Sequence, residues 1–512
     1  FGGDTDNWEW PRHTGDFAIF RVYTDKDGNP ADYSVDNVPM KPKYHLPISL
    51  KGYEENDFAM ILGYPGRTNR WMPASGVAQN VDYAYPAWVE GSKLSMDVMK
   101  KYMDADQKVR LDYASKYAGI ANYWKNRGGM IEALKEHKTV DKKRQMEREF
   151  TEWANRTGKK DKYGDVVEII DHYYNKTNEK SRQHNYLFSM LRGTVFTVTP
   201  YSLGTSLVQY ASENEAKREE MRPRLEEYIE NFFEGIHMPL EEEVFAKQLN
   251  LYYAKGAKGG LAPYVKELGD RFEGNFDAYI KNGFNSSVFT KKDRLLAYLD
   301  NPKASHIEED ELFKLSTDLM THYRAETPEE KALKDSYIRS FRLLVEGLRE
   351  SGLSPIQYPD ANSTLRLTYG TIRPLPLGEG KVNDAQYNYY TTLKGTIAKH
   401  KPGDDEFENP QKLIDLYNAK DYGQYADKNG ELWVNFLTDH DITGGNSGSP
   451  VLNGNGELIG IAFDGNIEAM AGDVIFDPEL QRAINVDIRY VLFIVDKYAG
   501  ANHIIDELTI VK

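Results

Sequence analysis

The sequence predicts a multi-domain α+β protein in which a β-rich domain is split by a large all-α helical insertion. Two changes in hydrophobic periodicity support this prediction. Alternating apolar and β-branched runs, typical of strands, occur as far as Gly63, and long charged segments with helical periodicity fill residues 94–349. Strand-like runs return at Leu365. The expected domains are the first part of the β domain (1–68), the helical domain (69–363) and the second part of the β domain (364–512).

Composition limits the classes of function. The 512 residues are enough for two or more domains with cores of their own. A formal net charge of −15, with Lys and Arg interspersed among the acids, argues against nucleic acid as the main partner. Cysteine is absent, which excludes a disulfide framework, a metal–thiolate site and a thiol nucleophile. No apolar run approaches the roughly 20 residues of a membrane span, so we expect no span. We also expect neither a metal nor a cofactor.

The chain begins with Phe1 inside a motif rather than with Met, and it carries no signal-peptide pattern. We interpret it as a piece whose natural N-terminus is missing. An export signal, if the protein has one, is therefore expected outside this chain.

The chain opens with a loop, residues 1–16, that combines aromatic, polar and turn-forming side chains and is typical of a segment that holds a ligand. A strand is predicted at residues 17–23, directly after Asp16. An acid at the mouth of a buried strand suits the third member of a catalytic triad. Two further strands are predicted at residues 45–50 and 58–63.

The helical domain is predicted from apolar stripes on charged segments. Its start and stop signals include prolines at first turns and one capping box, Thr327 with Glu330. The expected helices include residues 96–117, 142–153, 223–233 with Pro223 in the first turn, and 329–348.

The second part of the β domain contains the motif 443–450, which places glycines on both sides of Ser447 at a sharp turn. Such a turn presents a hydroxyl as a nucleophile, and the N–H groups of Gly445 and Ser447 can converge to form an oxyanion hole. Residues 451–463 are typical of a strand, an Asn-Gly turn and a second strand. In an α/β-hydrolase the serine would open a helix, whereas here Pro450 begins a strand. This layout favours a β-barrel protease over a plain loop.

A hydroxyl nucleophile needs a base, usually an imidazole oriented by a carboxylate. None of the 11 histidines is an obvious candidate. His13 is too close in sequence to Asp16 to be a separate base, and a loop or turn role suits His440, shortly before Ser447, better than catalysis. In chymotrypsin-like enzymes the chain order is His, Asp, Ser. With Asp16 as the acid, the base is expected upstream of Phe1, and this chain alone is expected to be inactive.

Three separated motifs carry a resemblance to a known family: residues 1–17, 121–125 and 443–450. They closely resemble bacterial dipeptidyl-peptidases of serine peptidase family 46, in family order and over the whole chain. The resemblance implies a chymotrypsin-like double β-barrel capped by a helical domain, and release of dipeptides from the free N-terminus of oligopeptides. It also implies a homodimer in the bacterial periplasm or at the cell surface. The family's N-terminal part, with its signal peptide and catalytic histidine, is absent from this chain.

By position in these motifs, the resemblance assigns Asp16 as the triad acid, Ser447 as the nucleophile, and Gly445 with Ser447 as oxyanion donors. The residues that it assigns to the substrate's α-amino group are Asn7, Trp8, Asn122 and Asp464, with Arg12 in support. An ammonium needs acceptors, and each charged hydrogen bond contributes about 1.5–3 kcal/mol. Because Asn122 comes from the insertion, we expect the helical domain to close one end of the cleft and to exclude a continuing chain.

Specificity should depend on the strand after the serine, which ends at Asp464 and Gly465. In acid-specific members of the family an arginine follows the aspartate. Gly465 leaves space and brings no positive charge, so we expect a hydrophobic residue before the cut, as in the dipeptidyl-peptidase 7 type. A second interpretation, that Gly465 permits close backbone approach, is compatible with the first.

Two other classes of function stay open at this point. A chymotrypsin-like endopeptidase is disfavoured, because a helical lid with an ammonium clamp would block internal cleavage. A non-catalytic peptide-binding or scaffold protein is permitted by the missing histidine. A histidine in a strand-end loop upstream of Phe1 would separate these alternatives from an active peptidase.

Overall fold

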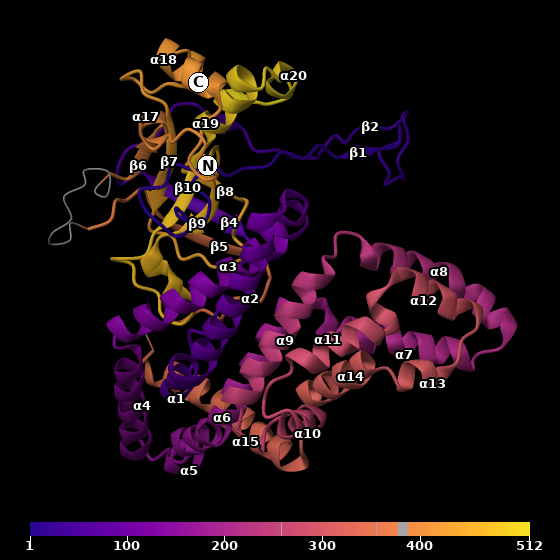
Figure 1. Cartoon of the computed structure of the whole chain (residues 1–512). Helices are drawn as coiled ribbons and strands as arrows, with labels where there is room; N and C mark the ends of the chain where they lie inside the picture. Colours follow the sequence, from indigo (N-terminus) through magenta and orange to yellow (C-terminus); the bar gives the residue numbers. More distant parts are fainter. Residues whose placement is uncertain (258, 355, 377–387) are drawn as a thin grey trace. The chain divides into compact units, whose positions relative to one another are not determined.

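The computed structural model describes residues 1–257, 259–354, 356–376 and 388–512. The chain forms two compact units (Figure 1). The β unit consists of Phe1–Trp71 and Tyr358–Lys512, and the helical unit consists of Met72–Gln357. The prediction of a helical region inserted into a largely antiparallel β region is confirmed at this level.

The β unit contains a nine-stranded sheet whose main path runs β5-β4-β8-β9-β10-β7-β6. Neighbours on this path are antiparallel, whereas β3 pairs in parallel with β9 and β11. The strands are β3 (Ile48–Ser49), β4 (Phe58–Gly63), β5 (Arg366–Thr371), β6 (Tyr390–Thr392), β7 (Trp433–Thr438), β8 (Ser449–Asn453), β9 (Leu458–Gly465), β10 (Ala483–Asp487) and β11 (Ile510–Val511). Helices of this unit are α17 (Leu393–Ala398), α18 (Gln411–Ala419), α19 (Ile488–Phe493) and α20 (Asn502–Ile505).

The strands near the two edges of this sheet approach each other. Ile372, just after β5, forms an antiparallel bridge with Thr438 at the end of β7. Next to the bridge, the N–H of Arg373 donates to the carbonyl of Leu437 at 3.2 Å. The enclosed core is apolar and includes Tyr53, Ile61, Phe436, Val451 and Ala462. The sheet thus curls toward closure, while the predicted double barrel remains a prediction.

The strand predicted at residues 17–23 is wrong over most of its length. Only β1 (Tyr23–Thr24) forms there, and it pairs with β2 (Val38–Pro39) in a hairpin that projects from the β unit (Figure 1). Phe20 is 89% exposed. No strand in the described part of the chain pairs with residues 17–21, and a strand needs a partner for its backbone groups. An apolar run alone therefore does not make a buried strand.

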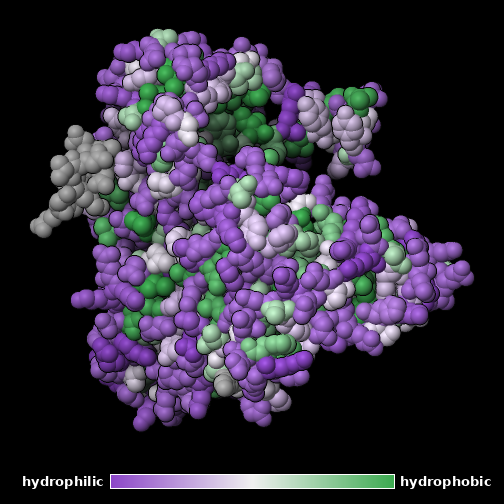
Figure 2. All heavy atoms as spheres, in the orientation of Figure 1, coloured by the Kyte–Doolittle hydropathy of each residue, from purple (hydrophilic) through white to green (hydrophobic). Residues whose placement is uncertain are grey.

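The helical unit is built from long helices around an apolar core. Phe196, Phe245, Phe276 and Phe289 are among its fully buried side chains. Hydrophilic side chains cover most of its visible face (Figure 2). The helices are α1 (Ala74–Gln79), α2 (Tyr85–Ala105), α3 (Gln107–Glu136), α4 (Thr139–Arg156), α5 (Lys160–Tyr163), α6 (Val166–Gly193), α7 (Thr199–Ser212), α8 (Glu215–Phe233), α9 (Met238–Lys255), α10 (Pro263–Arg271), α11 (Asp277–Ser286), α12 (Lys292–Asp300), α13 (Ala304–Glu308), α14 (Glu311–Arg324) and α15 (Pro328–Ser351).

Helix boundaries correct two predictions and confirm one. The helix predicted over residues 96–117 is interrupted at Asp106, whose side chain accepts the N–H of Lys108 at 2.8 Å and caps α3. Pro223 lies inside α8 and not in its first turn. The capping box before α15 is confirmed, because Thr327 and Glu330 each accept the other's backbone N–H. In the described ranges, no helix is both long and apolar enough to cross a membrane.

Candidate active site

Ser447 lies exposed in the loop between β7 and β8. The glycines beside it have positive φ angles, +105° at Gly445 and +87° at Gly448, which other residues rarely adopt. The N–H of Asn446 donates to the carbonyl of Thr443 at 3.0 Å and closes the turn. Local sequence chemistry therefore holds the hydroxyl on a tight, solvent-accessible turn.

Two backbone donors lie beside this hydroxyl. Among the described residues, the N–H groups of Gly445 and Ser447 donate to no protein acceptor, whereas the N–H of Gly448 donates to the carbonyl of Ala462 at 2.8 Å. Unpaired N–H groups next to an exposed hydroxyl are the arrangement that an oxyanion hole requires.

The serine also contacts the strand that follows it. Its Oγ donates to the carbonyl of Phe463 on β9 at 3.3 Å. The next residues on β9 are Asp464 and Gly465, which the sequence assigned to substrate binding. The structure thus brings the proposed nucleophile and the proposed ammonium acceptor to one end of one strand.

Asp464 is buried in a dense set of donors. Its Oδ2 accepts from the Arg12 guanidinium at 2.7 Å and from the N–H of Trp8 at 3.1 Å, and its Oδ1 accepts from the N–H of Gly465 at 2.9 Å. The side chains of Arg12 and Asp464 are only 6% and 9% exposed. Burial raises the pKa of the Asp464 carboxyl above its ordinary value, while the nearby guanidinium and N–H groups act in the opposite direction.

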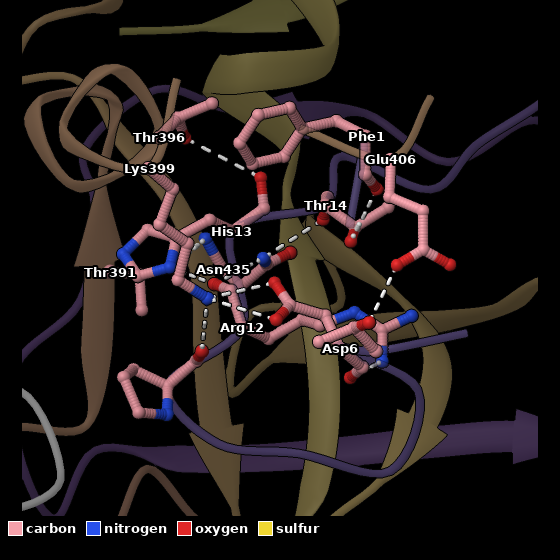
Figure 3. Close-up of polar contacts among 12 residues, drawn as sticks. Phe1, Asp6, Arg12, His13, Thr14, Thr391, Thr396, Lys399, Glu406 and Asn435 are labelled. Atoms are coloured by element: carbon pink, nitrogen blue, oxygen red, sulfur yellow. Dashed lines mark hydrogen bonds and ion pairs between the residues drawn. The ribbon is translucent and has the colours of Figure 1, made fainter. Parts of the chain in front are cut away.

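A network of polar contacts fastens the opening loop to the rest of the β unit (Figure 3). Lys399 holds the carboxylate of Asp6 with Nζ–O distances of 2.8 and 3.0 Å. The amide of Asn435, fully buried on β7, donates to the carbonyls of Arg12 and Thr14 at 2.8 and 2.9 Å. Because these partners come from distant parts of the chain, the loop is fixed by tertiary contacts and not by its own turns.

Space around Gly465 is limited. An ideal Cβ at this position would lie 3.0 Å from the Cβ of Ala469, 3.4 Å from the carbonyl of Arg482 and 3.8 Å from the ring of Trp8. A larger residue therefore has to displace a neighbour by a few tenths of an ångström. Any side chain at position 465 would start next to the ring of Trp8.

His13 and His440, the two histidines near the site residues in the sequence, are both buried and neither contacts Ser447 among the described residues. Burial, with the neighbouring Lys399 ammonium, lowers the pKa of His13 to about 3. His440 is 1% exposed, its Nε2 donates to the carbonyl of Ala59 at 3.0 Å, and burial lowers its pKa to about 4. In the described part of the chain, no histidine forms a hydrogen bond with Ser447.

The remaining assigned residues are more scattered. Asp16 is exposed, and within the described residues it makes no hydrogen bond to Ser447. Asn7 is partly buried in the opening loop, and its N–H donates to the carbonyl of Asp4 at 3.3 Å. Asn122 is exposed on α3 of the helical unit. The described ranges contain no group of three or more His, Asp or Glu side chains arranged to hold a metal ion.

Sequence reasoning missed the residues that fasten the opening loop. Asn435 could have been found, because it is a polar residue in the middle of the apolar run Trp433–Thr438. Lys399 directly follows the short helix α17 and gives no such signal. Its contact with Asp6 joins residues 393 positions apart, so it became visible only in the folded chain.

Comparison with known proteins defines the class of this protein. A dipeptidyl-peptidase 7 of Capnocytophaga gingivalis is 50% identical over 513 residues, covering 100% of this chain and 71% of the relative. An Asp/Glu-specific dipeptidyl-peptidase of Flavobacterium psychrophilum is 37% identical over 532 residues, with the same two coverages of 100% and 71%. The crystal structure of Porphyromonas endodontalis DPP11 in complex with the dipeptide Arg-Glu superposes with a TM-score of 0.90 at 34% identity, covering 99% of this chain and 72% of that one.

These similarities identify a serine-type dipeptidyl-peptidase, a hydrolase of peptide bonds. The family model of Peptidase S46 matches residues 1–510. The chain belongs to the Peptidase S46 family. The resemblance drawn from the three sequence motifs is thereby confirmed.

Proposed function

We propose that Ser447 is the nucleophile of this dipeptidyl-peptidase and that the N–H groups of Gly445 and Ser447 bind the oxyanion. The observation that supports this assignment is the exposed hydroxyl beside two backbone donors that no described protein group uses. The hydroxyl attacks the carbonyl carbon of the second residue of the peptide, and the oxyanion forms within reach of both donors. Asp16 is proposed as the acid of the triad on the strength of its motif.

We further propose that Asp464 binds the substrate's α-ammonium and so restricts cleavage to dipeptides. Arg12 and the N–H of Trp8 occupy Oδ2, and the N–H of Gly465 takes one position on Oδ1. A carboxylate oxygen offers two acceptor positions, so Oδ1 keeps one for an ammonium. Asn7 and Asn122 would add neutral acceptors. Because Asp464 directly follows the Phe463 carbonyl that contacts Ser447, the bound amine lies a fixed distance from the attacking oxygen.

Asp464→Asn tests the ammonium site with little change in shape. We expect kcat/KM for a free dipeptidyl fluorogenic substrate to fall by the equivalent of about 2–5 kcal/mol, because one partner of a desolvated charge pair is lost. Asn122→Ala should cost less, and the two losses should be non-additive, because both groups bind one ammonium. An N-acetylated substrate should be cleaved poorly by the wild type and be little affected by either change.

Asp6→Asn is the matched control, since it removes another buried carboxylate that fastens the same loop. It should affect free and acetylated substrates to the same degree. Equal slowing of both substrates by Asp464→Asn would show that Asp464 acts through the fold, and the ammonium assignment would be wrong.

We propose separately that the enzyme prefers a hydrophobic side chain on the residue before the cut. The 50% identical relative is named a dipeptidyl-peptidase 7, other relatives are named Asp/Glu-specific dipeptidyl-peptidases, and the similar crystal structure of DPP11 holds Arg-Glu. The alternative is a preference for Asp or Glu before the cut. Gly465 supports a hydrophobic preference, because it brings no cation to pair with a carboxylate.

Gly465→Arg should shift the preference toward Asp and Glu by placing a guanidinium near the substrate side chain. Gly465→Ala is the control for crowding, because its Cβ meets Ala469 without adding charge. The measurement is kcat/KM on dipeptidyl substrates with Leu, Phe, Asp and Glu before the scissile bond. A wild-type enzyme that already favours Asp and Glu would contradict the proposal.

From the family resemblance we also propose a chymotrypsin-like double barrel, a homodimer and a location in the bacterial periplasm or at the cell surface. Light scattering of the full-length protein measures its mass in solution and so tests whether it is a dimer. Cell fractionation with an antibody to the protein tests the location. A monomer, or a purely cytoplasmic pool, would contradict the respective proposal.

A further inference from the structure

The segment that leaves β4, residues 64–70, follows the loop that precedes the nucleophile. The N–H of Gly66 donates to the carbonyl of Gly444 at 2.7 Å. An ideal Cβ on Gly445 would lie 2.5 Å from the carbonyl of Tyr64 and 2.7 Å from the nitrogen of Gly66. The backbones of the two segments are therefore in direct contact, with no side chain between them.

The Gly66 bond sets the direction of one of the proposed oxyanion donors. The carbonyl of Gly444 and the N–H of Gly445 belong to the same peptide unit. In a trans peptide these two groups point in opposite directions. Because the carbonyl is held toward Gly66, the N–H of Gly445 faces away from the segment and remains without an acceptor among the described residues. A flip of this peptide would remove the donor from the site.

Arg70 braces the same loop from its other end. Its guanidinium donates to both carboxylate oxygens of Asp441, at 2.8 and 2.6 Å. The hydroxyl of Tyr358 donates to Asp441 at 2.8 Å, and the Nε of Arg70 donates to the carbonyl of Gly472. The side chain of Arg70 is only 1% exposed, so a planar, two-bond contact of this kind fixes both partners.

A third contact lies between these two. The hydroxyl of Thr443 donates to the carboxylate of Asp473, and the carbonyl of Asp473 accepts the N–H of Asn69 at 2.6 Å. The segment 64–70 thus holds the loop at Asp441, Thr443 and Gly444 in succession. Tyr358 and Arg70 also flank the two points where the chain crosses between the units.

We infer that the segment 64–70 positions the oxyanion hole, with the N–H of Gly66 orienting the Gly444–Gly445 peptide and Arg70 bracing it through Asp441. We assign Gly66 and Arg70 as positioning residues, because each acts on the loop through Gly444 or Asp441. The inference rests on the proposed roles of Ser447 and Gly445. It adds that the geometry of the oxyanion donors depends on a segment distant in sequence from the nucleophile.

Gly66→Ala tests the orientation directly, because an added Cβ would lie 2.9 Å from the carbonyl of Gly444 and would push it. We expect kcat to fall by about 10-fold to 100-fold in the full-length protein, given that loss of a whole oxyanion donor costs about 10²–10³. KM and Tm should change little. Gly454→Ala is the control, since its Cβ meets only a ring atom of Phe58 at 3.9 Å.

Arg70→Lys keeps the charge and loses the two-bond fork to Asp441. We expect kcat to fall by about 3-fold to 10-fold with KM unchanged, since the loop keeps the Gly66 bond but loses its brace. Arg489→Lys is the matched control, because Arg489 forms a buried fork with Asp487 in the same unit and, among the described residues, makes no hydrogen bond or ion pair with this loop. We expect Arg489→Lys to lower Tm as much as Arg70→Lys does, and to leave kcat within about 2-fold of the wild type.

The readout specific to an oxyanion hole is inhibition by a dipeptidyl aldehyde, which forms a tetrahedral oxyanion with a serine. Gly66→Ala and Arg70→Lys should weaken this inhibition by the same factor as kcat, and leave binding of the product dipeptide unchanged. Equal weakening of aldehyde and product, unchanged aldehyde inhibition, or the same kcat loss in Arg489→Lys would overturn the inference. Failure of the aldehyde to inhibit the wild type would instead contradict the role proposed for Ser447.

Discussion

The two units of this protein are stabilised by different interactions. The helical unit has a large apolar core, and most of its ion pairs are partly exposed. The β unit has smaller apolar clusters and buries more Asp, Glu, Arg and His side chains. Those in the β unit are Asp6, Arg12, His13, Arg70, His440, Arg482, Asp487 and Arg489, against Glu147, Glu241 and Asp310 in the helical unit.

This difference indicates where the chemistry lies. Burying a charge costs several kcal/mol unless it is paired and hydrogen-bonded, and replacing a buried pair by apolar residues is often neutral or stabilising. Burying charge is thus a poor way to gain stability. In the β unit, Arg12 holds Asp464 on β9, and Arg70 holds Asp441 in the loop that carries Ser447. We interpret these pairs as fixing the geometry of the site, whereas the helical core supplies stability.

The largest expected effect concerns activity alone. Ser447→Ala in the full-length enzyme should reduce turnover by several orders of magnitude, about 10⁴-fold or more, because triad members act as a unit. Tm should be unchanged, since the hydroxyl is exposed and makes one 3.3 Å hydrogen bond. Ser449→Ala, in the same motif, is the control and should retain most activity. Near-normal turnover of Ser447→Ala would remove Ser447 as the nucleophile.

Acid should destabilise the β unit before the helical unit. The pKa values of His13 and His440 are lowered by burial to about 3 and about 4. Between these values and the ordinary 6.5, the unfolded chain binds protons that the native state does not, so stability falls as pH falls. At pH 5 the loss is about 2 kcal/mol for each histidine relative to pH 8.

Hydrogen exchange followed separately in the two units between pH 8 and pH 5 measures this effect. Partial burial against Tyr323 also lowers the pKa of His184 in the helical unit, but this residue is more exposed than His13 and His440, so we expect a smaller contribution. His13→Gln or His440→Gln should flatten the pH dependence of the β unit. Equal acid sensitivity of both units would break the comparison.

The smallest effect tests a local interaction in the helical unit. Thr327→Ala removes the capping box of α15 and should lower stability by about 1 kcal/mol. Thermal unfolding of the helical unit should shift, while kcat and KM stay unchanged. Ser305→Ala is a control on an exposed polar residue of the same unit. A change in kcat in Thr327→Ala would show that the helical unit influences chemistry through its stability.

The sequence by itself determined the features that depend on neighbours along the chain. The glycines around Ser447, the strand and turn that follow, and the Thr327–Glu330 box are local, because positive φ angles, tight turns and caps are decided within a few residues. The change from strand to helical periodicity is local in the same sense, and it predicted the insertion. The three motifs and their order along the chain were sufficient to recognise the family.

Only the tertiary structure decided the features that depend on distant partners. The apolar run 17–23 looked like a strand, but strand formation needs a neighbouring backbone, and only its last residue is paired. Asp464 and Arg12 are 452 positions apart, and their contact, with the pKa shift that burial causes, exists only once the sheet has formed. The same holds for Gly66 and Gly444, whose hydrogen bond forms because the two glycines are close in space, which sequence spacing does not specify.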